Sequence, residues 1–269
     1  MFLATHGVIR NNSGGGYTAR TTAFATATAI TDTTILNALN TFDLGLISNG
    51  LDTKMKAIYP FVGSTATTQK FNFMDARDLD VAFRLNFSGG ITHSSTGALF
   101  GGVNGYADTK LIPSTNFTFG STHISIYSRT NAQKDAWNGA SNSFLPIFAL
   151  NLRATDDIIS FDGYDYSAHR ISALSTDSRG FFIGNVSSTT SQKIYKNGSS
   201  IVSNTTAQTQ TTLPSNSMFL AGRNDSGSTS SYDNKEIALA TIGIGLTDTD
   251  ASNLYTLVQA FQTSLSRQV

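Results

Sequence analysis

The chain has 269 residues, no cysteine, and 18 basic residues that balance 18 acidic ones. The lack of cysteine excludes disulfides, thiol catalysis and cysteine-ligated zinc. The formal net charge of zero gives no electrostatic basis for binding nucleic acid or an anionic membrane, and no segment approaches the roughly 20 apolar residues that span a bilayer. Because charged residues make up only 13 % of a chain rich in Ser, Thr, Asn and Gly, we expect a surface suited to sugars or to other protein subunits.

Residues 1–16 predict an anchoring arm followed by a hinge. The segment carries four apolar residues that a disordered tail would not need: Phe2, Leu3, Val8 and Ile9. It ends in a Ser-Gly-Gly-Gly run, which is typical of a flexible hinge. We expect the apolar residues to dock to a partner as an added strand or in a groove; an untidy terminus is the alternative. The apolar run is too short for a signal peptide, and no basic residue precedes it.

Residues 17–62 predict a helical connector. Thr31-Asp32 offers a helix cap, and Asn49-Gly50 supplies a left-handed stop. Between the two, apolar residues recur at helical spacing on one face: Ile35, Leu39, Phe42 and Leu46. This face predicts ordinary packing against the rest of the domain.

Residues 63–269 carry the pattern of a β-sandwich with a closing helix. Alternating or apolar runs predict strands at 81–87, 123–129, 143–152, 157–161, 181–186, 218–222 and 237–244. Turns are expected at Asp162-Gly163, Arg179-Gly180 and Ser226-Gly227. Asn197-Gly198 predicts a two-residue hairpin turn, because a type I′ turn needs positive φ at both central positions.

The closing helix is predicted after a capping-box-like start, Thr247-Asp248-Thr249-Asp250. Its buried face consists of Ala251, Leu254, Leu257, Val258, Phe261 and Leu265. We expect this face to pack on the sheet.

No catalytic constellation is apparent. Aspartates gather in "DARDLD" and "DDIISFDGYDY", but their alternate-residue pattern is poor for a pair of glycosidase carboxylates on one strand, and Glu occurs only at Glu236. The four histidines are scattered singly, so a zinc site is not expected. A calcium site built from Asp and backbone carbonyls stays open, although no EF-hand-like loop marks it.

A sugar-binding site has more support from the residues. Such a site needs an aromatic plane together with amide or carboxylate groups. The candidates are Trp137 and Asn138 in "WNGASN", and Asn104, Tyr106 and Asp108 in "NGYAD". The alternative is that Trp137 is a partly buried structural residue.

Several segments together resemble a known family. The segments "FFIGNV", "SQKIYKNGSSI", "SMFLAGR" and "EIALATIGIGLTDTDASNLYTLVQAF" look like the second half of a concanavalin A-like (laminin-G-like) domain. Upstream, "MKAIYPFVG", "DLDVAFRLNFSGG", "ITHSSTG" and "NGYADT" are similar to segments found with that domain in bacteriophage virion proteins, above all those of crAss-like phages. The resemblance covers roughly residues 31–269.

The resemblance implies an all-β jelly-roll sandwich with an N-terminal helix and a closing C-terminal helix. It does not imply catalysis, because this chain lacks the Glu-x-Asp-x-Glu strand of the hydrolase members. It implies a virion protein, a head fibre or capsid decoration, whose partners are capsid or fibre subunits and host or mucosal glycans. A homo-oligomer is expected, with a trimer as one arrangement. The alternatives are a secreted bacterial carbohydrate-binding module and a tail-fibre receptor-binding protein, with a glycoside hydrolase ranked last.

Overall fold

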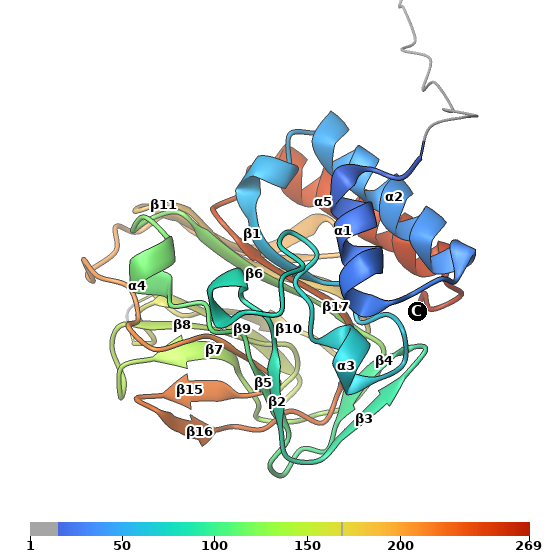
Figure 1. Cartoon of the computed structure of the whole chain (residues 1–269). Helices are drawn as coiled ribbons and strands as arrows, with labels where there is room; N and C mark the ends of the chain where they lie inside the picture. Colours follow the sequence, from blue (N-terminus) through green and yellow to red (C-terminus); the bar gives the residue numbers. More distant parts are fainter. Residues whose placement is uncertain (1–15, 168) are drawn as a thin grey trace, which may run out of the picture.

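The computed structural model describes residues 16–167 and 169–269, and this part of the chain folds into three layers (Figure 1). An eight-stranded sheet and a nine-stranded sheet pack face to face, and helices cover the far side of the eight-stranded sheet. The predicted jelly-roll sandwich with an N-terminal helix and a closing C-terminal helix is therefore confirmed.

The eight-stranded sheet is the middle layer, and its central strands are buried on both faces. Its order is β13-β12-β11-β6-β17-β4-β3, with β1 paired to β17. Along β6, Ile124 and Ile126 face the core between the sheets, whereas Tyr127 faces the core beneath the helices. The strand predicted at 123–129 is confirmed as β6, and it is buried along its whole length. The strands are β1 (Met55–Tyr59), β3 (Ile91–Ser94), β4 (Gly97–Phe100), β6 (Thr122–Ser128), β11 (Gly180–Ser188), β12 (Ser191–Lys196), β13 (Ser199–Asn204) and β17 (Glu236–Gly243).

The nine-stranded sheet has one face in the core and one face free of helices. Its order is β10-β9-β8-β7-β14-β5-β2, and β15 joins it by pairing in parallel with β7 and antiparallel with β16. On the inner face, the rings of Phe148 and Phe161 meet edge to face at 5.5 Å between centroids. The strands are β2 (Asn86–Ser88), β5 (Tyr106–Asp108), β7 (Asn138–Ser141), β8 (Ile147–Asn151), β9 (Ile158–Tyr164), β10 (Ile171–Leu174), β14 (Phe219–Leu220), β15 (Arg223–Asp225) and β16 (Ser228–Ser230).

The helices α1 (Ala19–Thr28), α2 (Thr33–Ser48) and α5 (Asp248–Ser264) lie together on the eight-stranded sheet (Figure 1). Asp32 caps α2, and Thr247 caps α5 in a capping box with Asp250, as the sequence predicted. The two long helices approach closely at Gly45, where a Cβ atom would lie 2.3 Å from Leu257 Cδ2. The remaining helical segments are short: η1 (Asp52–Lys54), α3 (Ala66–Gln69), η2 (Asp80–Ala82) and α4 (Pro113–Asn116).

The hairpin predicted from Asn197-Gly198 is confirmed. It joins β12 to β13, and φ is 49° at Asn197 and 78° at Gly198, as a type I′ turn requires. The turn at Ser226-Gly227 is confirmed in the same way and joins β15 to β16.

Some sequence predictions differ from the structure. Residues 81–87 do not form one strand, because η2 and a left-handed Phe83 interrupt the segment and only 86–88 pair. Asp162-Gly163 is not a turn but lies inside β9, where a Cβ on Gly163 would lie 2.7 Å from Val186 of the facing sheet. Glycine is needed there for the close approach of the two sheets. Of residues 17–62, α1 and α2 are helical, and β1 pairs with β17 in the middle sheet.

The C-terminal segment is held in the helix-side core by Arg267. Its side chain is buried and donates to the backbone oxygens of Phe61, Pro60 and Ala238 at 3.0, 3.1 and 3.1 Å. Removal of water lowers the pKa of the guanidinium, and the ring of carbonyl oxygens replaces the lost hydration. Beside it, the Val269 N–H donates to the Tyr127 hydroxyl at 3.0 Å.

His123 lies in the middle sheet and is fully buried. One ring nitrogen, Nδ1, donates to the Ile244 carbonyl at 2.6 Å, and Nε2 accepts from the Thr241 hydroxyl at 3.0 Å. These partners suit a neutral imidazole. Burial lowers the pKa of His123 from 6.5 to about 4.

We predict that this histidine makes the fold sensitive to acid. The unfolded chain takes up a proton on His123 near pH 6.5, whereas the folded chain takes it up only near pH 4. Its contribution is therefore fully present above pH 6.5 and is lost as the pH falls toward 4, by about 3 kcal/mol of unfolding free energy. Urea unfolding of the wild type and His123→Gln across this range measures the difference. Parallel pH curves for the two proteins would contradict the prediction.

Candidate functional site

The outer face of the nine-stranded sheet is the helix-free face, and alternation decides which side chains it presents. Ala107 and Leu220 point into the core between the sheets, so their neighbours Tyr106, Asp108 and Phe219 point outward. The same alternation directs Asp162 outward, because Phe161 lies in the core. Strand pairing thus gathers residues from distant parts of the sequence on one surface.

Trp137 lies directly before β7 and contacts a fixed arginine on this face. The Arg170 guanidinium stacks over the indole, with its Cζ atom 4.7 Å from the ring centroid. Arg170 also donates two hydrogen bonds to Asp162, from Nε at 2.6 Å and from Nη2 at 2.7 Å. Such a bidentate pair fixes the plane of the guanidinium. Trp137 therefore has one face held by a rigid cation.

The electrostatics of this pair follow from unequal burial. The Asp162 side chain is fully buried, while 37 % of the Arg170 side chain is exposed. Burial raises the pKa of Asp162, and the hydrogen bonds from Arg170 oppose that rise. Those same bonds raise the pKa of Arg170. The carboxylate therefore serves as the anchor and the guanidinium as the accessible group.

A second arginine–carboxylate pair lies beside the first. Because β15 runs parallel to β7, Arg223 is in register with Gly139, and Asp225 with Ser141. Arg223 Nη2 lies 3.4 Å from Asp225, whose other oxygen accepts from the Ser141 hydroxyl at 2.9 Å. The Arg223 Nε atom is buried without a hydrogen-bond partner among residues 16–167 and 169–269.

The cluster predicted at 104–108 lies on the same face, beyond Trp137. The Tyr106 ring stacks on Phe219 with 4.6 Å between centroids, and its centroid lies 6.3 Å from that of Tyr232. The residue before Tyr232, Ser231, accepts a hydrogen bond from the Trp137 backbone N–H through its carbonyl oxygen. The two predicted aromatic groups are thus brought to one surface.

The polar members of the predicted site have local partners. Asp108 pairs with Lys110 at 2.7 Å, and the exposed Asn104 accepts a hydrogen bond from the Gly90 backbone at 3.0 Å. Asn138 is fully buried; its amide accepts from Ala221 N at 2.6 Å and donates to the Leu150 carbonyl at 3.3 Å. The assignment of Asn138 to a sugar-contacting site is therefore corrected. Asn138 lies on the same side of β7 as Ala140, which faces the core between the sheets.

Arg170, Asp162, Arg223 and Asp225 were missed by the sequence analysis. Asp162 was interpreted as a turn residue, and nothing in the local pattern around Arg170 marks a site. Their roles arise from strand pairing between segments that are far apart in the chain, so no short motif could have identified them.

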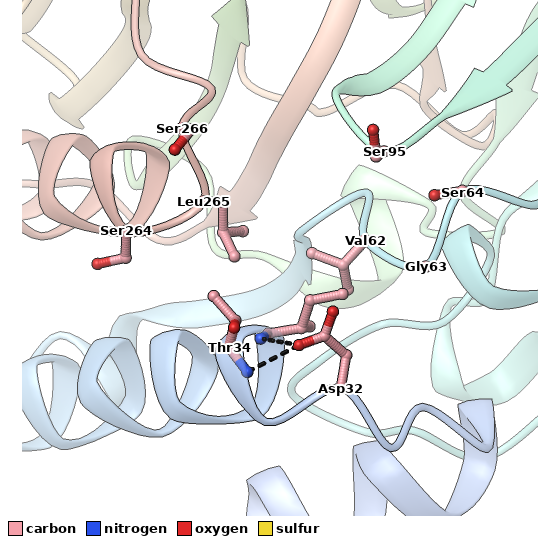
Figure 2. A pocket seen from close by; sticks show the side chains of 10 residues that line it. Asp32, Thr34, Val62, Gly63, Ser64, Ser95, Ser264, Leu265 and Ser266 are labelled. Atoms are coloured by element: carbon pink, nitrogen blue, oxygen red, sulfur yellow. Dashed lines mark hydrogen bonds between the residues drawn. The ribbon is translucent and has the colours of Figure 1, made fainter.

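A separate hollow of about 240 Å³ lies where the start of α2 meets the C-terminal end of α5 (Figure 2). Its polar lining is mainly hydroxyl groups, and its carboxylate, Asp32, already accepts hydrogen bonds from the backbone of Thr34 and Ile35. The hollow therefore offers hydroxyl groups and a single carboxylate, which has no acid–base partner among the lining residues. Other residues around it are Val62, Gly63, Ser64, Ser95, Ser264, Leu265 and Ser266.

Three further observations concern the described part of the chain. Within it, no three His, Asp or Glu side chains are placed together to hold a metal ion. No helix there is both long and apolar enough to cross a membrane. The predicted anchoring residues Phe2, Leu3, Val8 and Ile9 lie outside the described residues.

Comparison by sequence finds no match to a known protein family or to a curated protein. Comparison by structure does. Domain 4 of AbnA, a GH43 extracellular arabinanase from Geobacillus stearothermophilus in complex with arabinotriose, aligns with a TM-score of 0.50 and 14 % identity, covering 75 % of this chain and 98 % of that domain. A receptor binding domain aligns with a TM-score of 0.51 and 12 % identity, covering 78 % of this chain and 52 % of that one. At these identities the likeness establishes the lectin-like β-sandwich fold alone.

We predict that Asp162 controls the environment of Trp137. Asp162→Asn should free the Arg170 guanidinium, lower the unfolding free energy by about 1.5–3 kcal/mol, and shift the indole emission to longer wavelength. Trp137 is the single tryptophan, so intrinsic fluorescence reports on this site alone. The matched control is Asp75→Asn, which breaks the exposed Asp75–Arg77 pair elsewhere on the surface. Identical spectra for wild type and Asp162→Asn would contradict the prediction.

Proposed function

We propose that the chain is a non-catalytic glycan-binding β-sandwich, carried on a bacteriophage particle as a head fibre or capsid decoration. The observation that carries the first half is the Trp137 indole beside an arginine fixed by Asp162 on the helix-free face. An aromatic plane next to a preorganised hydrogen-bond donor is the combination that sugars require, since their rings have apolar faces and their edges carry hydroxyls.

The site is suited to binding rather than to hydrolysis. Glycoside hydrolysis needs one carboxyl group that donates a proton and a second that acts as base or nucleophile. On this face Asp162 is held by Arg170, Asp108 by Lys110, and Asp225 by Arg223 and Ser141. Each of these carboxylates is engaged with a basic side chain, so no two of them form a free acid and base pair.

Affinity for one glycan should be modest, because a sugar hydroxyl exchanges water hydrogen bonds for protein ones at a net gain of about 1 kcal/mol each. Display in many copies raises the effective affinity by roughly 10² to 10⁴. A repeated virion protein meets that requirement, and the resemblance to domains of phage virion proteins supports the same assignment. Its partners would be capsid or fibre subunits, in a homo-oligomer such as a trimer.

We predict that Trp137 is required for glycan binding. A glycan array probed with the multimerised protein should give signals that Trp137→Ala lowers by roughly tenfold or more. Leu44→Ala, an exposed apolar residue of α2 on the opposite side of the sandwich, is the matched control and should bind as the wild type does. An array without signal for any protein, or binding that Trp137→Ala leaves unchanged, would contradict the proposed site.

We predict that the protein is part of the phage particle. Mass spectrometry of purified particles should detect it, and deleting residues 1–16 should leave a folded sandwich that no longer joins particles. Absence from particles would remove the virion assignment while leaving glycan binding intact. Normal incorporation of the truncated protein would place the anchor elsewhere in the chain.

A further inference from the structure

Two pairs of flat side chains form a row at the outer face of the nine-stranded sheet. The Arg170 Cζ atom lies 4.7 Å from the centroid of the Trp137 ring, and the rings of Tyr166 and Phe144 lie 6.2 Å apart between centroids. Arg170 and Tyr166 belong to the same connection, between β9 and β10, which brings the two pairs to one part of the sheet. We call these four residues the outer-face row. They come from three connections, before β7, between β7 and β8, and between β9 and β10.

The far end of the row is exposed although it is aromatic. Phe144 is 68 % exposed and Tyr166 is 39 % exposed. A paired Phe and Tyr at such exposure do not contribute to the core, and large exposed aromatic side chains typically mark contact sites. Ser143 directly precedes Phe144, and its hydroxyl lies 2.9 Å from the hydroxyl of Ser226 in the β15–β16 turn. The pair thus repeats, at a second position, the combination of ring and hydrogen-bonding groups present at Trp137.

The row is longer than one sugar ring. Trp137 directly precedes the four residues of β7, and Phe144 follows them. At about 3.4 Å per strand residue, the four residues of β7 span roughly 14 Å, and the two rings belong to residues beyond its opposite ends. A ligand that contacts both ends must therefore be a chain.

The row is also electrically balanced. Each guanidinium has its own carboxylate, Asp162 for Arg170 and Asp225 for Arg223, and Phe144 and Tyr166 add no charge. Because both guanidinium groups of this face are already neutralised by a carboxylate, the face offers no net positive charge to attract an acidic ligand. Arg170 Nη1 makes no hydrogen bond to any residue that the structure describes, so it is available to a hydroxyl.

We propose that the outer-face row binds a neutral glycan chain lengthwise, with Trp137–Arg170 and Phe144–Tyr166 as two separate stacking subsites. This inference rests on the proposed glycan-binding function and goes beyond it by naming the ligand class as an extended neutral polysaccharide. A single terminal sugar would occupy the Trp137 subsite alone. Contact at both subsites would add their free energies, so affinity should rise with chain length until the row is filled.

The test is a titration of the full-length protein with neutral oligosaccharides of one to six sugars, from arabinan, xylan, mannan, cellulose and starch. Binding is followed by the fluorescence of Trp137 and by calorimetry. We expect the affinity for at least one series to rise by roughly tenfold or more between the monosaccharide and the longer chains. Phe144→Ala should remove that gain and leave the shortest binding ligand unaffected, whereas Trp137→Ala should abolish both. Leu44→Ala is the matched control on the helix side.

The outcomes separate the two levels of the proposal. If no ligand binds at any length, the glycan-binding function itself fails, and the inference fails with it. If a monosaccharide binds as tightly as its longer chains, and Phe144→Ala changes nothing, the function stands and the two-subsite row is overturned. Tighter binding of oligogalacturonates would overturn the neutral ligand class. A change in oligomeric state with Phe144→Ala, without a change in glycan binding, would assign the aromatic pair to contacts between protein copies instead.

Discussion

The burial of the eight-stranded sheet on both faces is the constraint on which the rest of the structure depends. Its inner face packs on the second sheet, and its outer face packs on α1, α2 and α5. The central strands β6, β11 and β17 are therefore buried along nearly their whole length, whereas the edge strands β13 and β3 keep exposed positions. Among the described residues, the nine-stranded sheet is the one with a face that no long helix covers (Figure 1), and the candidate site lies on that face.

The arginine pairs make that face rigid without making it charged. An exposed guanidinium would sample many rotamers, and ordering it on binding would reduce affinity. Asp162 fixes Arg170 in advance because the carboxylate is buried and hydrogen-bonded through both oxygens. Without Arg170, the Asp162 carboxylate would be an uncompensated buried charge. The ion pair that orients the site therefore also stabilises the sheet beneath it.

The parts of the fold that depend on local chemistry could be predicted from the sequence. The caps at Asp32 and Thr247 and the turn at Asn197-Gly198 each follow from a few adjacent residues. The need for glycine at position 163 could not be predicted in this way, because it comes from the close approach of the opposing sheet rather than from a turn. The same limit applies to the site: Trp137 and Tyr106 are visible as aromatic residues among polar ones, whereas Arg170 and Asp162 gain meaning only through strand pairing.

The position of the C-terminal segment gives the molecule a direction. Arg267 holds this segment against the helix-side core, and the chain end lies beside the helices (Figure 1). The first described helix, α1, lies in the same layer. A protein attached to a support through either of these regions would therefore point its nine-stranded sheet away from the support. In an array of copies attached through the helix layer, the nine-stranded sheet of each copy and its aromatic row would face away from the support.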